Sequence, residues 1–352
     1  MKKIVLFVFA LIALIGLGSC GAKEYKLGMG VEVSTSSSTN ATADKAGNAQ
    51  VDATVAAVVL GSDGKIVACR IDAVQNKIAV SSEGAVTVPT TFKTKMELGA
   101  DYHMADWGKN QDNNGDGIVK EWNEQAKAFE EYVVGKTADQ INGLELQTLD
   151  NGYKISKDEV LLNAGCTIQI TDFIAAVVKA CKDEQAVTFT SGEFTLGVAA
   201  SSYNDGSKNA AADANGAVQV YSDFAATVVA NGKIVAALND AIQPKFAVSA
   251  TGALTASYTN TKRCLKFDYH MSDWGKNQDN NGDGIVKEWF EQSAAFSEYV
   301  VGKTGAEVAA LETTTLDNGY KISSDEILLN AGCTIQITAI KEVVAKAFTN
   351  AR

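Results

Sequence analysis

The chain is poor in proline, histidine and basic residues. Its 352 residues include two prolines, two histidines and 31 lysines and arginines against 42 acidic residues, for a net charge of -11. A chain this acidic is a poor binder of nucleic acid and of anionic lipid headgroups, and a better host for cations, so we expect no nucleic-acid partner. Aromatic residues make up only 8% of the chain, but hydrophobic residues make up 46%, which is ample for buried cores.

A catalytic set is also missing. The two histidines, His103 and His270, stand in matching Tyr-His-Met sequences. We expect each to be half-buried at the end of a β-layer, with a position beside a cofactor as the alternative. No combination of nucleophile, base and orienting group is recognisable, so a hydrolase is not indicated. The chain is more typical of an electron carrier or a binding protein than of an enzyme.

Cysteines are few and do not form a repeated pattern. Of the six cysteines, Cys20 lies near the N-terminus and the others are Cys69, Cys166, Cys181, Cys264 and Cys333. This is an odd number beyond Cys20, so not all of them can pair within the chain. We therefore predict buried thiols and no disulfide framework.

The N-terminal segment has the pattern of a lipoprotein signal. Lys2 and Lys3 precede an apolar run over residues 4–15, and Leu17-Gly18-Ser19-Cys20 follows. The run is too short for a permanent transmembrane helix. The pattern predicts that residues 1–19 are removed and that Cys20 carries the lipid, with a buried helix as the alternative. We expect an extracytoplasmic protein that reaches the cell membrane or cell surface through this anchor alone.

The chain contains a long internal repeat. The stretch DWGKNQDNNGDGIVKEW at 106–122 recurs unchanged at 273–289, and YVVGKT, TLDNGYKIS and LLNAGCTIQIT each occur twice as well. A repeat of this length exceeds a solenoid unit, so each copy should have its own core. We predict two tandem homologous domains, residues 20–182 and 190–352, called here the first and second repeat.

Each repeat reads as strands followed by helices, which predicts an α+β fold of antiparallel hairpins and short helices. In the first repeat, alternating runs at 51–60 and 65–74 flank a GSDG turn, and a strand at 27–33 precedes a mobile polar segment at 34–49. A helix is predicted at 121–134, and two short helices are predicted with capping boxes at Thr137 and Ser156. The last helix begins at Thr171.

The repeated stretch has the spacing of a calcium loop. EF-hand and dockerin loops need oxygen ligands at positions 1, 3 and 5, a glycine at 6 and a backbone carbonyl at 7. The candidate ligands in the first repeat are Asp112, Asn114, Asp116 and Ile118, and those in the second are Asp279, Asn281, Asp283 and Ile285.

Position 12 of the loop should be a glutamate but is Asn123 in one copy and Phe290 in the other. The glutamates on either side could supply the missing carboxylate, and we take Glu124 and Glu291 as the candidates, with Glu121 and Glu288 as alternatives. We expect weak binding, on the order of 0.1 to 1 mM. The alternative is an Asn-Gly-rich turn that only introduces a helix.

A second repeated motif, NAGCTIQIT, suits a phosphate group. A glycine that can take a positive φ, a hydroxyl after it and a Thr-capped helix would place an exposed threonine beside a helix N-terminus. The motif and the order of elements around it resemble the FMN-binding domain of bacterial surface lipoproteins. The resemblance implies that Thr167 and Thr334 bear the flavin, with Gly165, Thr171 and Phe173 matching in the first repeat and Gly332 and Thr338 in the second.

The motif also departs from that family. Leu161 and Leu328 replace the aspartate that the family's flavin transferase recognises, the family's Ser-Ser pair is absent, and Ile340 replaces the aromatic residue in the second repeat. Two hypotheses follow. The first is an FMN-binding protein that exchanges electrons with redox partner proteins at the cell surface. The second is a noncatalytic, calcium-stabilised binding or structural module on the same scaffold.

Overall fold

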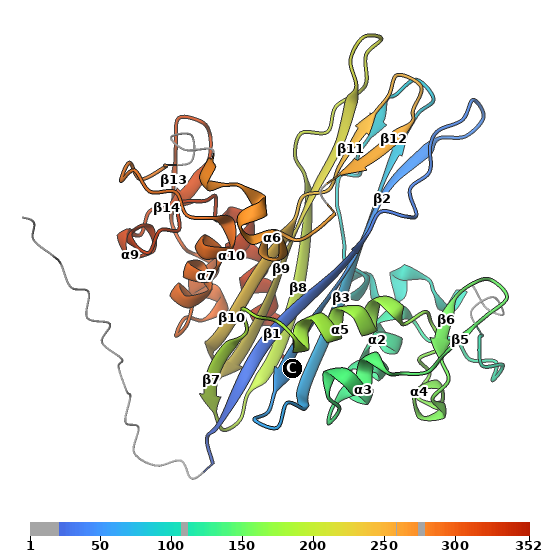
Figure 1. Cartoon of the computed structure of the whole chain (residues 1–352), viewed down its shortest axis with the longest axis vertical. Helices are drawn as coiled ribbons and strands as arrows, with labels where there is room; N and C mark the ends of the chain where they lie inside the picture. The colour runs from blue at the N-terminus through green and yellow to red at the C-terminus, as the bar shows by residue number, and fades with distance from the viewer. Residues whose placement is uncertain (1–20, 107–111, 258, 274–278) are drawn as a thin grey trace, which may run out of the picture.

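The computed structural model describes residues 21–106, 112–257, 259–273 and 279–352 (Figure 1). Over these residues the fold is mixed α+β, with antiparallel sheets and several short helices, which confirms the predicted class. The predicted signal at 1–19 and the lipid site Cys20 lie outside the described residues, as does the part of each repeated loop at 107–111 and 274–278.

Two large antiparallel sheets form the centre of the molecule. The first has the strand order β4 (Val86–Thr87), β3 (Ile66–Val80), β2 (Gly47–Leu60), β1 (Lys23–Ser34) and β7 (Val187–Ser191). In the second, β9 (Gly216–Ala230) pairs with β8 (Thr195–Asn204), β10 (Lys233–Ile242) and β11 (Lys245–Val248), and β12 (Leu254–Ser257) pairs with β11. Two small hairpins complete the strands, β5 (Leu146–Thr148) with β6 (Lys154–Ser156) and β13 (Thr313–Thr315) with β14 (Lys321–Ser323).

The two large sheets share one core between them. Alternate residues of β2, such as Val51 and Val55, belong to the same buried cluster as Val198 and Phe224 of the second sheet. This alternation is the period expected of a strand with two covered faces. The prediction of a separate core for each repeat is therefore only partly right, because this largest core draws on both repeats.

Helices cover the outer face of each sheet. On the first sheet these are α2 (Trp122–Val133), α3 (Ala138–Asn142) and α5 (Thr171–Cys181), and on the second α7 (Trp289–Tyr299), α8 (Gly305–Ala309) and α10 (Thr338–Thr349). The shorter helices are α1 (Lys95–Leu98), η1 (Gly99–Tyr102), α4 (Glu159–Asn163), α6 (Lys262–Leu265), η3 (Lys266–Tyr269) and α9 (Glu326–Asn330). Figure 1 shows the two groups on opposite sides of the long strands, giving layers in the order α, β, β, α.

Glycines on β1 let α5 lie directly on the sheet. A Cβ at Gly28 would stand 2.1 Å from the Ala180 carbonyl oxygen, and one at Gly30 would stand 2.3 Å from that of Ala176. Leu27 and Met29 alternate with these glycines and face the shared core. In the sequence LGMG, the two glycines thus face helix α5 and the two apolar side chains face the other sheet.

Most of the predicted elements agree with the structure. The segment at 34–49 was expected to be mobile, but bridges between Thr39 and Asn48 and between Thr42 and Lys45 extend the β1–β2 hairpin. Contacts from the second repeat support this tip, since the Gly252 carbonyl accepts from Ala41 N at 3.1 Å. The predicted cap of α4 at Ser156 is also wrong, because Asp158 caps that helix and Ser156 Oγ accepts from Asp158 N.

Candidate functional site

The repeated loop folds tightly around its own acidic side chains. In the first repeat, Asp112 Oδ2 accepts a hydrogen bond from Gly117 N at 2.9 Å, and Asp116 Oδ1 accepts from Ile118 N at 2.7 Å. Asn114 Nδ2 donates to the other oxygen of Asp116 at 2.9 Å. Gly117 has φ +80, which confirms the sharp turn predicted at position 6.

Two oxygen atoms in this loop are buried and have no hydrogen-bond partner in the described part of the chain. Asp112 Oδ1 and Asn114 Oδ1 are inaccessible and accept no hydrogen bond from the described residues. The same holds for Asp279 Oδ1 and Asn281 Oδ1 in the second loop. A buried acceptor left without a partner costs about 1–3 kcal/mol, so these four atoms need an explanation.

The second loop repeats the hydrogen bonds of the first. Asp279 Oδ2 accepts from Gly284 N at 3.0 Å, and Asp283 Oδ1 accepts from Ile285 N at 2.8 Å. Asn281 Nδ2 donates to Asp283 Oδ2 at 3.0 Å. Both loops therefore present the same pair of unpartnered oxygens at positions 1 and 3.

The glutamates that could close the loop are engaged at the start of the next helix. Glu121 accepts from Met104 N at 2.9 Å and from Ala105 N at 3.1 Å, while Glu124 Oε2 accepts from Glu121 N at 2.9 Å. Glu288 and Glu291 make the corresponding bonds before α7. Each pair acts as a capping box, so Glu124 and Glu291 stay predictions as metal ligands.

Position 12 differs between the two loops in the structure as it does in the sequence. Asn123 Oδ1 is buried without a partner among the described residues, whereas Phe290 packs edge-on against Phe267 with ring centroids 5.3 Å apart. Over the described part of the chain there is no cluster of three or more histidine, cysteine, aspartate or glutamate side chains suited to a metal. A loop that uses amide and backbone oxygens has only two carboxylates of its own and does not form such a cluster.

The repeated loop is also the partner of the NAGCTIQIT turn. Asn113 Nδ2 donates to the Thr167 carbonyl at 2.8 Å, and Lys120 Nζ donates to the Ala164 carbonyl at 2.9 Å. Asn280 and Lys287 donate to the Thr334 and Ala331 carbonyls, each at 2.8 Å. The two repeated stretches are thus two halves of one hydrogen-bonded assembly in each repeat.

A buried glutamine completes this assembly, and sequence reasoning did not identify it. Gln125 is fully buried, its Oε1 accepts from Thr167 N at 2.9 Å and Ile168 N at 3.1 Å, and its Nε2 donates to the Lys120 carbonyl at 2.7 Å. Gln292 bonds Thr334 N and the Lys287 carbonyl in the same way. The signal available was the glutamate-glutamine pair that recurs at the same place on both predicted helices.

The threonines of this turn do not fit a phosphate-linked flavin. Thr167 and Thr334 were predicted to be exposed, but they are only 2% and 3% exposed. Their hydroxyls point to Gln125 Oε1 and Gln292 Oε1, at 3.5 and 3.3 Å. A phosphoryl group on either oxygen would have to displace the glutamine that holds the turn.

The other residues matched to the flavin family are partly or fully buried. A Cβ at Gly165 or Gly332 would meet the side chain of Lys120 or Lys287 at 2.7 Å. The predicted threonine caps are wrong, because Thr171 and Thr338 begin their helices without a side-chain cap, and Thr338 Oγ1 is buried without a partner among the described residues. The Phe173 ring packs against Trp122 at 5.6 Å.

Among the described residues, the histidines and cysteines do not cluster into a metal site. His103 and His270, predicted to be half-buried, lie on exposed left-handed turns and contact Asp106 and Asp273 at 2.9 and 3.0 Å. All five described cysteines are free thiols, and Cys69, Cys166 and Cys333 are buried as predicted. Burial raises the pKa of the Cys166 and Cys333 thiols to about 12, which makes them unreactive. Cys264, in contrast, is exposed.

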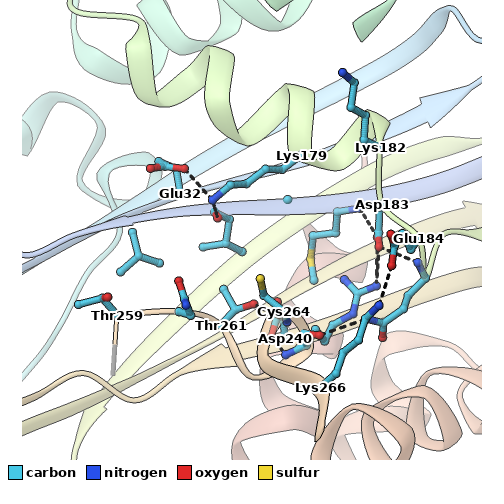
Figure 2. A pocket seen from close by; sticks show the side chains of 17 residues that line it. Glu32, Lys179, Lys182, Asp183, Glu184, Asp240, Thr259, Thr261, Cys264 and Lys266 are labelled. Atoms are coloured by element: carbon cyan, nitrogen blue, oxygen red, sulfur yellow. Dashed lines mark hydrogen bonds and ion pairs between the residues drawn. The ribbon is translucent and has the colours of Figure 1, made fainter. Parts of the chain in front are cut away.

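A charged cleft of about 440 Å³ lies where the two repeats meet (Figure 2). Arg263 donates to both oxygens of Asp183, at 3.0 and 3.1 Å, and their side chains are only 6% and 8% exposed. Figure 2 shows Lys266 reaching Glu184 and Lys179 reaching Glu32, at 2.6 and 2.7 Å. Most charges in the cleft are paired in this way, and the pairs of Arg263 and Lys266 link the second repeat to the segment between the repeats.

The described residues include no helix that is both long and apolar enough to span a bilayer. Comparison of the chain with known protein families, with characterised proteins and with solved structures found no match.

Proposed function

We propose that the chain is a noncatalytic surface module of two homologous units, each stabilised by a calcium ion in its repeated loop. Support for two units comes from the matched sequences and from the matched hydrogen bonds of their loops, turns and glutamines. The lipoprotein pattern that ends at Cys20 supports a membrane-anchored, extracytoplasmic location.

The pair of unpartnered loop oxygens carries the calcium proposal. Carboxylate and amide oxygens at positions 1 and 3 are the ligands that calcium takes in loops of this type. A bound cation would satisfy Asp112 Oδ1 and Asn114 Oδ1, whereas a simple turn gives no reason to bury them. Asp116 and the Ile118 carbonyl would add further ligands, as Asp283 and the Ile285 carbonyl would in the second loop.

The proposed role of calcium is structural. Asn113 and Lys120 flank the ligand residues and hold the NAGCTIQIT turn, so an ion that orders the loop also orders the turn. The buried Thr167 and Thr334 hydroxyls give the flavin hypothesis no support from geometry. A flavin absorption band in protein exported by its own secretion machinery would instead favour that hypothesis.

Thermal or urea unfolding with calcium and with chelator tests the proposal. For a dissociation constant of about 0.1–1 mM, 10 mM calcium adds roughly 1.4–2.7 kcal/mol of stability per site. Asp112→Asn with Asp279→Asn removes two ligand charges and should abolish this gain. The matched control is Asp101→Asn with Asp268→Asn, which makes the same charge change at exposed positions and should keep it. Equal stability of the unmodified chain in calcium and in chelator would reject the metal.

A further inference from the structure

A second cleft, of about 400 Å³, opens on the first repeat beside the NAGCTIQIT turn. Its lining combines aromatic rings with charges of both signs and short hydroxyl side chains. Among the lining residues are Ser34, Asp52, Lys95, Tyr102, Trp122 and Tyr153. This volume falls in the range of small-molecule sites.

Lys95 forms part of this lining and contacts aromatic faces. Its Nζ stands 5.1 Å from the centroid of the Tyr102 ring and 5.4 Å from that of Trp122. No carboxylate of the described residues lies within ion-pair distance of Lys95. Nearby Asp52 and Asp172 act on it only through longer-range attraction, while burial lowers its pKa. Because the Lys95 ammonium is partly dehydrated, a further aromatic ring placed over it would be stabilised by a cation–π interaction.

The second repeat fills the corresponding place with its own side chains. Ser34 pairs with Asp52 across β1 and β2, and the matching pair across β8 and β9 is Tyr203 with Tyr221. These two phenol rings stack with centroids 5.3 Å apart and planes at 4°. The Tyr221 ring lies 5.4 Å from Lys262, the counterpart of Lys95.

Lys262 thus lies near one more aromatic ring than Lys95 does. Both lysines contact a tyrosine and a tryptophan from equivalent elements, but Lys262 also contacts Tyr221. In the first repeat the position of Tyr221 is held by Asp52, which lines the open cleft. The stacked tyrosines of the second repeat therefore indicate that the cleft of the first repeat can accept an aromatic ring.

The hydrogen bonds at this position also match. Gln219 Nε2 donates to the Tyr221 hydroxyl at 2.8 Å, and Gln50 Nε2 donates to Asp52 Oδ2 at 2.7 Å. A phenol in the first cleft could donate its hydroxyl to the Asp52 carboxylate while its ring faces Lys95. Lys77 and Lys95 balance Asp52 and Asp172 in the lining, which favours a neutral ligand.

We propose that the cleft between Ser34, Asp52 and Lys95 binds a neutral phenolic ring, which takes the place of the tyrosine pair of the second repeat. The ring is carried either by a small molecule or by a tyrosine side chain of a peptide. This proposal does not depend on calcium in the repeated loop.

Titration of the full chain with p-cresol, followed by ligand-observed NMR and calorimetry, tests the proposal. One site is expected, with millimolar affinity typical of a ligand of this size. The saturated analogue 4-methylcyclohexanol has the same heavy atoms and no π-face, so it should bind about tenfold more weakly. N-acetyltyrosinamide distinguishes the sources, because tighter binding than p-cresol indicates a peptide and weaker binding a free phenol. Equal binding of the saturated ring, or binding of a methyl glucoside in place of the phenol, would overturn the proposal.

Exchanges between the repeats supply matched variants. Ser34→Tyr with Asp52→Tyr copies the second repeat and should abolish binding, and Lys95→Met should weaken it about tenfold. The triple variant Tyr203→Ser, Tyr221→Asp and Asp223→Thr gives the second repeat the residues that the first has at these positions, Ser34, Asp52 and Thr54. It should raise the stoichiometry from one to two. If the triple variant does not fold, the Ser34 and Asp52 exchange remains decisive, because unchanged p-cresol binding in that variant would refute the assignment of the cleft.

Discussion

Replacement of Gln125 by leucine tests whether the repeated loop and the NAGCTIQIT turn are one structural assembly. The side chain is fully buried and bonds three backbone groups, namely the amides of Thr167 and Ile168 and the carbonyl of Lys120. Leucine has a similar size but no polar atom, so the change leaves these groups without that partner.

The expected loss follows from the cost of those unpaired groups. Each buried donor or acceptor without a partner costs about 1–3 kcal/mol, and such costs add incompletely when the groups are neighbours. We therefore expect Gln125→Leu to lower the free energy of unfolding by about 3–5 kcal/mol, near the upper limit for a single substitution. The assay is urea unfolding followed by circular dichroism, with the slope compared between variants.

Gln169→Leu is the matched control for this experiment. Gln169 lies in the same turn, two residues beyond Thr167, and its side chain is exposed. The same substitution there should change stability by less than about 0.5 kcal/mol. If the two variants unfold at the same urea concentration, the hydrogen bonds of Gln125 do not hold the turn, and the reasoning fails.

Three further predictions concern the junction of the repeats and the buried carboxyls. Asp183→Ala should cost about 3–5 kcal/mol in urea unfolding because it leaves the Arg263 guanidinium buried without its partner; a loss under 1 kcal/mol would contradict this. Burial raises the pKa of Asp72 to about 7. A carboxyl with a folded-state pKa above its unfolded value destabilises the fold as pH rises from about 4 to 7, so Asp72→Asn should gain stability over the unmodified chain across that range, by up to about 4 kcal/mol at pH 8, and a pH-independent difference would refute it. The core shared by both sheets predicts one cooperative calorimetric transition, whereas two separated transitions would indicate independently folding repeats.

Local patterns were enough to predict most elements of the fold. Alternation in residues 51–60 and 65–74 predicted the β2–β3 hairpin, and helical spacing of Trp122, Ala126 and Phe129 predicted α2. These signals are local because each depends on which residues share one face of a single element. The packing of two sheets on a common core was not predictable in this way. Both faces of β2 are apolar, and an apolar face does not indicate which element packs against it.

The candidate site shows the same limit. Ligand spacing predicted the turn at Gly117 and the positions of Asp112 and Asn114. The exposure of Thr167 was predicted wrongly because its burial depends on Gln125, a residue of α2 that is distant in the sequence. The charge of Asp183, just after the first repeat, likewise gave no hint that its partner is Arg263 of the second repeat.

Calcium titration by isothermal calorimetry tests the central claim most directly. Full chain freed of metal by a chelator should bind two calcium ions, with dissociation constants on the order of 0.1 to 1 mM. Asp112→Asn alone should leave one ion, bound by the second loop, and the pair Asp112→Asn and Asp279→Asn should leave none. No calcium heat in the unmodified chain, or two ions still bound by the double variant, would contradict the account.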